Sequence, residues 1–163
     1  MIKKTLLMFW LLILTSFSVS AAINDYIVKQ WNVQNGLPSQ SIKSLVQDNQ
    51  GYVWLGTQFG LSRFDGYQFR NFTTQNTQFL QTNAIHKLLL DRHGKLWIGT
   101  KRGLHRLNPK TLDVQSFNIK GPILDIVEDK QGDIWVAGNG LFYIGNDSQA
   151  QRDFDAAEGN KKL

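Results

Sequence analysis

The 163-residue sequence contains no cysteine. Disulfide bonds and thiolate metal sites are therefore excluded, even if the chain is exported to a compartment that would permit disulfides. Its only histidines are His86, His93 and His105, and their spacings match no metal-binding template. We interpret all three as surface side chains and expect no metal or other cofactor, so that packing alone must hold the fold together.

A strong excess of charge of one sign is also missing. The formal net charge is +5, and it falls to +3 without Lys3 and Lys4 near the start of the chain. No basic stripe is visible in the sequence, and a weak positive excess says little about nucleic acid. We therefore expect no nucleic-acid partner.

The chain has no apolar run long enough to cross a membrane. Two lysines precede an uncharged stretch over residues 5–19, and small residues follow up to Ala22. A basic start, an apolar core of about 14 residues and a small-residue end are typical of a secretory signal peptide, whereas a spanning helix needs roughly 20 apolar residues. We predict a signal peptide over residues 1–22, with cleavage after Ala21 or Ala22.

One short motif, by contrast, occurs three times. Its tryptophans are 43 and 38 residues apart, and in each copy an aspartate lies six residues before the tryptophan and a glycine three residues before it. A period of about 40 residues is the strongest signal in the sequence. The recurring residues are Asp48, Gly51, Trp54 and Gly56 in the first copy, Asp91, Gly94, Trp97 and Gly99 in the second, and Asp129, Gly132 and Trp135 in the third.

Each copy predicts short antiparallel strands. Apolar, partly β-branched segments at residues 41–47, 85–90 and 123–128 are typical of strands, and the Asp-x-x-Gly that follows each fits a type I turn. A second strand carries the tryptophan, a third follows after a tight loop, and turn residues precede a fourth. Four strands per repeat of about 40 residues are typical of a propeller blade. A helical solenoid is disfavoured, because no glycine-free window shows apolar residues at helical spacing.

The predicted fold is therefore all-β, an open, partial β-propeller of about three four-stranded blades. We assign the chain to a signal peptide (1–22), a lead-in strand and loop (23–41), three repeats (42–147, divided into about 42–84, 85–122 and 123–147) and a polar tail (148–163). Within the lead-in, Tyr26–Val33 is apolar and β-branched and predicts a strand. Since propellers close with about four to eight blades, we expect an opening fragment whose uncovered end blades favour self-association.

The first two copies resemble a known family. GLPSQSIKSLVQDNQGYVWLGTQFGLSRFDGYQF and AIHKLLLDRHGKLWIGTKRGLHRL follow the pattern D-x-x-G-x-[LIV]-W-[LIV]-G-T-x-x-G-L of the two-component regulator propeller repeat, and WNVQNGLPSQSI is similar to the segment that opens those domains. The resemblance covers roughly residues 26–145. The third copy departs from the pattern, because Ala137 and Gly138 replace Gly-Thr and its loop is one residue shorter.

The resemblance implies a periplasmic sensor domain. In that family the propeller precedes a transmembrane helix and a histidine kinase, diguanylate cyclase or DNA-binding output, and the suggested ligands are often carbohydrate fragments. We recognise no output domain of these kinds in the sequence. We therefore expect a sensor segment truncated before its output domain, which meets a small-molecule or carbohydrate ligand in a longer parent.

The recurring aspartates and tryptophans are interpreted as structural, serving as turn formers and inter-blade core rather than as a carboxylate ring or a carbohydrate platform. Loop positions whose identity differs between copies, while their frame stays constant, are better candidates for ligand contacts. Ordinary solvent-exposed loops remain the alternative interpretation. The candidate positions are Gln58, Phe59, Lys101, Arg102 and Asn139.

The predicted function is non-catalytic ligand sensing in the periplasm. Neither a calcium loop nor a nucleophile elbow is present, and no catalytic residue is predicted. Two alternatives from other classes remain open. The chain could belong to an exported propeller enzyme of the lyase or glycosidase type, or to a structural, protein-binding propeller module.

Overall fold

The structure is a computed structural model, and it describes residues 26–145 and 151–154. Residues up to Gln30 form a unit separate from the chain that begins at Trp31, and the two are described separately. The predicted signal peptide over residues 1–22 lies outside the described residues. None of the helical structure in the described ranges is long and apolar enough to cross a membrane.

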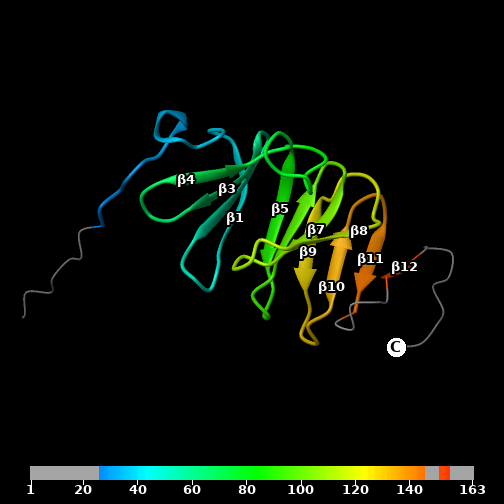
Figure 1. Cartoon of the computed structure of the whole chain (residues 1–163). Helices are drawn as coiled ribbons and strands as arrows, with labels where there is room; N and C mark the ends of the chain where they lie inside the picture. The colour runs from blue at the N-terminus through cyan, green and yellow to red at the C-terminus, as the bar shows by residue number, and fades with distance from the viewer. Residues whose placement is uncertain (1–25, 146–150, 155–163) are drawn as a thin grey trace, which may run out of the picture. The chain divides into compact units, whose positions relative to one another are not determined.

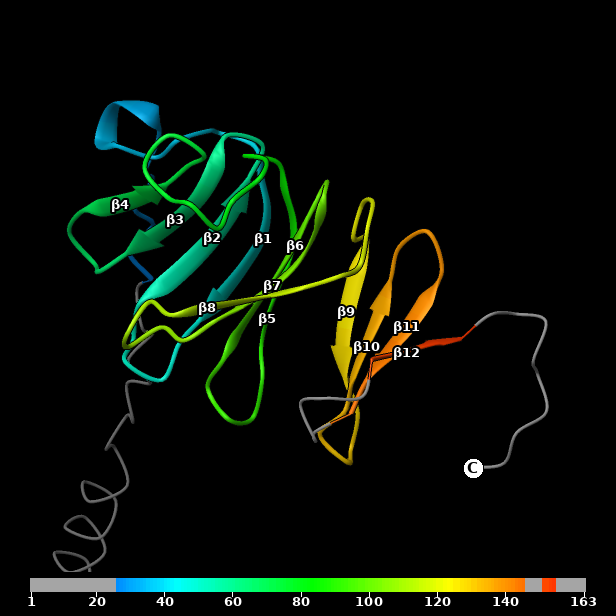
Figure 2. The same ribbon diagram turned by 45° about the vertical axis from the view of Figure 1, so that its right-hand side comes forward.

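From Trp31 onward the chain forms three four-stranded antiparallel sheets, each built from strands that are consecutive in the sequence (Figures 1 and 2). The first contains β1 (Ile42–Gln47), β2 (Val53–Thr57), β3 (Gly60–Phe64) and β4 (Phe69–Phe72). The second contains β5 (Ile85–Leu90), β6 (Leu96–Thr100), β7 (Gly103–Leu107) and β8 (Val114–Phe117). The third contains β9 (Asp125–Glu128), β10 (Ile134–Ala137), β11 (Leu141–Ile144) and β12 (Gln151–Phe154). The predicted all-β class with three four-stranded sheets is confirmed.

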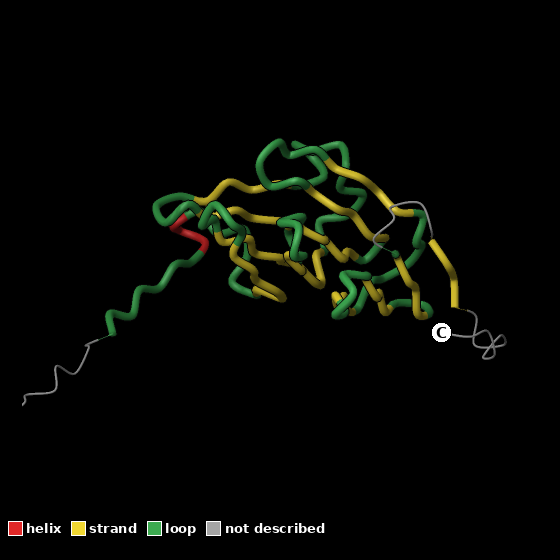
Figure 3. The backbone as a smooth tube through the Cα atoms, turned by 90° about the horizontal axis from the view of Figure 1, so that it is seen from below, coloured by secondary structure: helices red, strands yellow, loops and turns green. Residues whose placement is uncertain are grey.

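Two segments differ from the prediction. The lead-in strand expected over Tyr26–Val33 is not formed, because residues 26–32 have no regular secondary structure and Val33 begins the 3-10 helix η1 (Val33–Asn35), shown in red in Figure 3. An apolar, β-branched segment is a strand only where another strand can satisfy its backbone groups. Conversely, the tail predicted as polar from residue 148 contains β12. This strand pairs with β11 over four residue pairs, and backbone pairing at a sheet edge does not require an apolar sequence.

Neighbouring sheets pack face to face through two apolar cores. Trp54 is fully buried between the first and second sheets, and Trp97 is 2% exposed between the second and third. Trp135, the third tryptophan of the repeat, is only half-buried, and its ring meets Tyr143 edge-on at 5.1 Å. The repeated tryptophan therefore fills the interface with the next sheet wherever the described residues include that sheet.

The outer face of the first sheet is partly covered by the residues that precede β1. Trp31 packs edge-on against Phe64 with ring centroids 5.1 Å apart. The Asn71 side-chain amide donates a hydrogen bond to the Gly36 carbonyl (2.9 Å), and Leu37 is buried. This segment thus shields part of a face that would otherwise be open to solvent.

A glycine in the second strand of each of the first two sheets allows the next sheet to approach closely. A Cβ atom at Gly56 would lie 2.8 Å from Ile85 Cγ2, and one at Gly99 would lie 2.7 Å from Ile123 Cγ2. Both isoleucines are fully buried. The Gly of the repeated Gly-Thr pair is therefore a packing requirement of the interface, and the third copy has Ala137 at this position.

Replacing Gly99 with alanine is expected to lower the free energy of unfolding by about 1–3 kcal/mol, the usual effect of inserting an extra methyl group into a packed core. Urea denaturation of the full chain measures the change. In an Ile123→Ala background the obstructing methyl group is absent, so Gly99→Ala should have a clearly smaller effect there. An equal loss of stability in both backgrounds would contradict this origin of the glycine.

Candidate functional site

The connections of the three sheets lie on two opposite edges, because successive strands alternate in direction (Figure 2). We define the turn edge by the Asp-x-x-Gly turns and the turns between third and fourth strands, at residues 48–52, 65–68, 91–95, 108–113 and 129–133. We define the loop edge by residues 36–41, 57–60, 73–84, 100–103, 118–124 and 138–140. At the loop edge a backbone hydrogen bond from Ile123 N–H to the Thr100 carbonyl (2.9 Å) joins the third sheet to the second. Another, from Lys101 N–H to the Ala84 carbonyl (3.0 Å), extends the pairing of β5 with β6 within the second sheet.

The repeated aspartates of the turn edge are fully engaged in holding their turns. In the second copy, Asp91 Oδ1 accepts hydrogen bonds from the backbone N–H groups of His93 (3.0 Å) and Lys95 (2.8 Å), and Oδ2 accepts one from Trp97 Nε1–H (2.7 Å). The same arrangement recurs in the other two copies, with indole–carboxylate distances of 2.7 Å and 2.9 Å. In the third copy, the hydrogen bond from Trp135 lowers the pKa of Asp129. Each carboxylate therefore holds its own turn and fixes the position of the tryptophan that follows.

The faces of the two buried tryptophans are also occupied. Trp97 stacks on Phe117 at 5.0 Å, and the guanidinium carbon of Arg106 lies 5.4 Å from the indole. In the first sheet, Arg63 takes the same place at 5.6 Å from Trp54. These rings are covered by their own sheet and by the next one, which leaves them unsuited to stacking on a ligand.

The candidate ligand contacts lie on tight turns with a constant frame. In the first sheet, Thr57 Oγ1 donates a hydrogen bond to the Gly60 carbonyl (2.9 Å) and accepts one from Phe59 N–H (3.1 Å). Thr100 makes the same pair of bonds, at 2.9 Å and 3.0 Å, in the second sheet. The side chains between these anchors are solvent-exposed, and Phe59 is 63% exposed. Two turns of identical geometry thus display different side chains, Gln58 and Phe59 in one and Lys101 and Arg102 in the other.

The third turn lacks the threonine and is closed by a single backbone bond from Gly138 N–H to the Gly140 carbonyl (2.9 Å). Its exposed Asn139 lies against the β8–β9 connection, since a Cβ atom at Gly121 would meet the Asn139 side chain at 2.5 Å. The structure therefore places all five candidates on the loop edge. Among the described residues, no hydrogen bond joins candidates of different turns.

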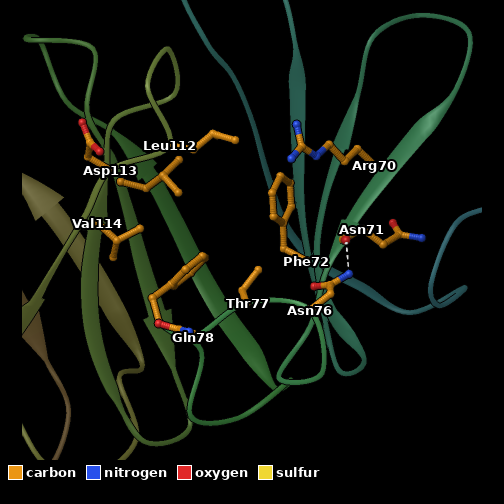
Figure 4. A pocket seen from close by; sticks show the side chains of 11 residues that line it. Arg70, Asn71, Phe72, Asn76, Thr77, Gln78, Leu112, Asp113 and Val114 are labelled. Atoms are coloured by element: carbon orange, nitrogen blue, oxygen red, sulfur yellow. Dashed lines mark hydrogen bonds between the residues drawn. The ribbon is translucent and has the colours of Figure 1, made fainter.

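A groove of about 610 Å³ opens between β4 of the first sheet and β8 of the second (Figure 4). One wall carries Arg70, whose guanidinium carbon lies 5.1 Å from the Phe72 ring. The opposite wall carries Leu112, the single non-glycine residue of the described ranges with positive φ (64°). The lining residues are Arg70, Asn71, Phe72, Asn76, Thr77, Gln78, Phe79, Leu107, Leu112, Asp113 and Val114.

None of the candidates chosen from the sequence lines this groove. Its floor comes from the β4–β5 connection, which is folded on itself by hydrogen bonds from Thr77 to the Thr73 carbonyl (2.9 and 2.8 Å) and from the Asn76 amide to the Asn71 carbonyl (2.9 Å; Figure 4). The sequence feature that could have indicated this groove is the unequal spacing of the tryptophans, 43 residues in the first interval and 38 in the second. The additional residues of the first interval lie here, since twelve residues separate β4 from β5 and seven separate β8 from β9.

The interpretation of all three histidines as surface side chains is wrong for His105. This residue is 4% exposed, its Nδ1 lies 2.8 Å from Ser116 Oγ, and its ring contacts Phe79 edge-on at 6.1 Å. Burial lowers its pKa, so the imidazole is neutral near pH 7. Among the described residues, no group of three or more histidine, aspartate or glutamate side chains is placed to hold a metal ion.

Comparison with known proteins assigns the repeats. Residues 36–59, 80–102 and 119–140 match the model of the two-component regulator propeller. Histidine kinase P4 of Formosa agariphila is 33% identical to this chain over 55 residues, which are 34% of this chain and 4% of the kinase.

Similar solved structures include the extracellular domains of two proteins of B. thetaiotaomicron described as hybrid two-component systems. The domain of BT3049 has a TM-score of 0.72 at 23% identity, with 82% of this chain and 21% of that chain covered. The domain of BT4673 has a TM-score of 0.67 at 28% identity, with 78% and 18% covered. Virginiamycin B lyase of Staphylococcus aureus shares the fold at 17% identity and a TM-score of 0.61, with 82% and 46% covered. This chain spans about a fifth of the length of these two extracellular domains.

Proposed function

Because this chain belongs to the two-component regulator propeller family, we propose that it is a non-catalytic, ligand-sensing propeller segment of an exported signalling receptor. The similar B. thetaiotaomicron structures are extracellular domains of two-component systems, which supports a location outside the inner membrane. The basic start and small-residue end of residues 1–22 support export by a signal peptide.

The observation that carries the sensing proposal is the constant frame of the loop edge. Thr57 and Thr100 close their turns with the same two hydrogen bonds, yet the exposed side chains between the anchors differ in charge and shape. A rigid scaffold that presents variable loop contents is how binding surfaces are commonly built. We therefore assign ligand contacts to this edge.

An enzymatic role is less well supported by the same geometry. The recurring carboxylates, which an enzyme of the lyase or glycosidase type could have used, are each bound to an indole and to backbone N–H groups of their own turn. The resemblance to virginiamycin B lyase is one of fold alone. The extracellular domains of the B. thetaiotaomicron proteins are about four times as long as this chain, so we further propose that signalling requires additional blades and an output domain.

Variants of the receptor tested in its source organism would probe this function. We expect Phe59→Ala and Arg102→Ala to weaken the transcriptional response to the extracellular signal, because both side chains project from the loop edge. Gln131→Ala, an exposed change on the turn edge, is the matched control and should leave the response intact. The readout is reporter expression at equal receptor abundance, judged by immunoblot.

Full responses from both loop-edge variants, together with a wild-type strain that responds, would overturn the assignment of ligand contacts. Retention of the amino-terminal residues and accumulation of the receptor in the cytoplasm would overturn export.

A further inference from the structure

One pair of positions changes its chemistry from sheet to sheet. It consists of the residue two before the repeated tryptophan and the residue that pairs with this tryptophan on the following strand. The two side chains lie on one face of their sheet, on a diagonal between neighbouring strands, where long side chains can touch. The pair is Tyr52 and Arg63 in the first sheet, Lys95 and Arg106 in the second, and Asp133 and Tyr143 in the third.

In the first and third sheets the two side chains of the pair bind each other. The guanidinium carbon of Arg63 lies 4.4 Å from the centre of the Tyr52 ring, which is a cation–π contact. The Tyr143 hydroxyl donates a hydrogen bond to Asp133 Oδ2 (2.7 Å). Each of these pairs therefore interacts favourably within its own sheet.

In the second sheet both members of the pair are cations. Lys95 and Arg106 together line two adjoining hollows, so that the two positive charges approach the same space. Like charges on neighbouring positions of paired strands destabilise a sheet. The ion pairs found in the described ranges join Lys87 to Asp125 (2.7 Å) and Arg92 to Glu128, so neither cation of the pair is neutralised in this way.

The carboxylates that line these hollows are engaged elsewhere. Asp91 lines the first hollow, and both of its oxygens accept hydrogen bonds from its own turn and from the following tryptophan. Asp113 lines the second hollow and accepts a hydrogen bond from the Thr111 hydroxyl (2.5 Å). The second sheet thus carries two positive charges whose counterpart is missing from the described part of the chain.

Both cations have unused hydrogen-bond donors. Arg106 has five N–H groups, and one of them is used by the hydrogen bond from Nη2 to Gln115 Oε1 (2.6 Å). The guanidinium is held in place over the Trp97 ring, with its carbon 5.4 Å from the ring centre. For the Lys95 ammonium group no hydrogen bond is found to any described residue. The donors are therefore available to a ligand.

The first hollow lies at the turn edge between the second and third sheets and has a volume of about 220 Å³. Sites for drug-sized ligands usually measure about 300–1,000 Å³, so this hollow suits a smaller molecule. Its walls come from Lys95, Trp97 and Arg106 of the second sheet and from Gly132, Ile134 and Ile144 of the third.

We propose that this hollow binds a small anion through a carboxylate or phosphate group that pairs with Lys95 and Arg106. Lysine and arginine form strong, charge-assisted hydrogen bonds with both groups. The site goes beyond the proposed function, which assigns signal recognition to the loop edge. Because the anion binds the folded chain at the interface of two sheets, it stabilises the fold in proportion to its occupancy.

Thermal unfolding of the purified full chain in sodium succinate and in sodium phosphate tests the proposal, with sodium chloride at equal ionic strength as the reference. We expect the Tm to rise with the concentration of one or both anions, and the chloride reference to exclude general screening. R106Q should raise the Kd, measured by titration calorimetry, about tenfold or more, because hydrogen bonds between charged groups are lost. R63Q removes the same charge at the equivalent position of the first sheet and should change the Kd by less than about twofold.

K95Y gives the second sheet the tyrosine–arginine pair of the first sheet. The new ring should bind the Arg106 guanidinium as Tyr52 binds Arg63. We therefore expect the Tm of this variant in chloride to be no lower than that of the wild type, while the rise caused by succinate or phosphate disappears.

A rise with succinate assigns a carboxylate ligand to the hollow, and a rise with phosphate assigns a phosphate ligand. The absence of a rise with both anions would overturn the proposal. So would an undiminished rise in R106Q and K95Y, or equal weakening by R106Q and R63Q. The measurement requires no receptor response, so its failure would leave signal recognition at the loop edge untouched.

Discussion

Replacing Trp97 with alanine should lower the free energy of unfolding by roughly 3–5 kcal/mol, the usual cost of truncating a large buried aromatic side chain. The indole is 2% exposed between the second and third sheets, stacks on Phe117 and donates a hydrogen bond to Asp91. Its removal leaves a cavity and an unused carboxylate oxygen at the same interface. Chemical denaturation of the full chain, followed by tryptophan fluorescence and circular dichroism, measures the loss.

Lys101→Ala, on an exposed turn only a few residues away, is the companion variant. It should change the stability by no more than about 0.5 kcal/mol, as is usual for surface substitutions. Similar small effects at both positions would show that the tryptophan contributes little to the core, and the interpretation of the repeat as a packing unit would fail.

Asp91→Ala is expected to lower the free energy of unfolding by about 2–4 kcal/mol. The substitution leaves the Trp97 Nε1–H buried without an acceptor, which alone costs about 1–3 kcal/mol, and it also removes the acceptor of two backbone N–H groups in the turn. Thermal and urea unfolding of the full chain would give this value.

Asp91→Asn separates the contribution of shape from that of charge. The asparagine side chain keeps one acceptor oxygen for the backbone but presents an NH2 group toward the indole. The stability of the Asp91→Asn variant should therefore lie between those of the wild type and of the Asp91→Ala variant. In the receptor, a folded Asp91→Asn variant should still respond to the signal. Loss of the response at unchanged stability would assign this carboxylate to ligand binding instead.

The features that were predictable from the sequence are those set by local spacing. An aspartate six residues before a tryptophan is enough to specify both the turn and the indole contact, because all of the atoms involved lie within one hairpin. The tight turns that carry Phe59 and Arg102 follow in the same way from the residues that frame them.

The features that were missed depend on segments that meet only in the folded chain. The groove in Figure 4 forms because β4 and β8 belong to neighbouring sheets and a twelve-residue connection runs between them. His105 is buried because Ser116 and Phe79 lie against it, and neither neighbour is evident from its own repeat. β12 forms because the backbone groups at the edge of β11 are available for pairing, and this pairing does not depend on the polarity of the β12 residues.

Each sheet pairs its strands only with its own, and neighbouring sheets are joined mainly by side-chain packing. Such a molecule behaves energetically as a linear array, in which the total stability is a sum of terms for single units and for the contacts between adjacent ones. Most of its hydrogen bonds close short stretches of chain, so that little loop entropy opposes their formation. The second sheet packs against two neighbouring sheets within the described residues. It should therefore be the last of the three sheets to unfold.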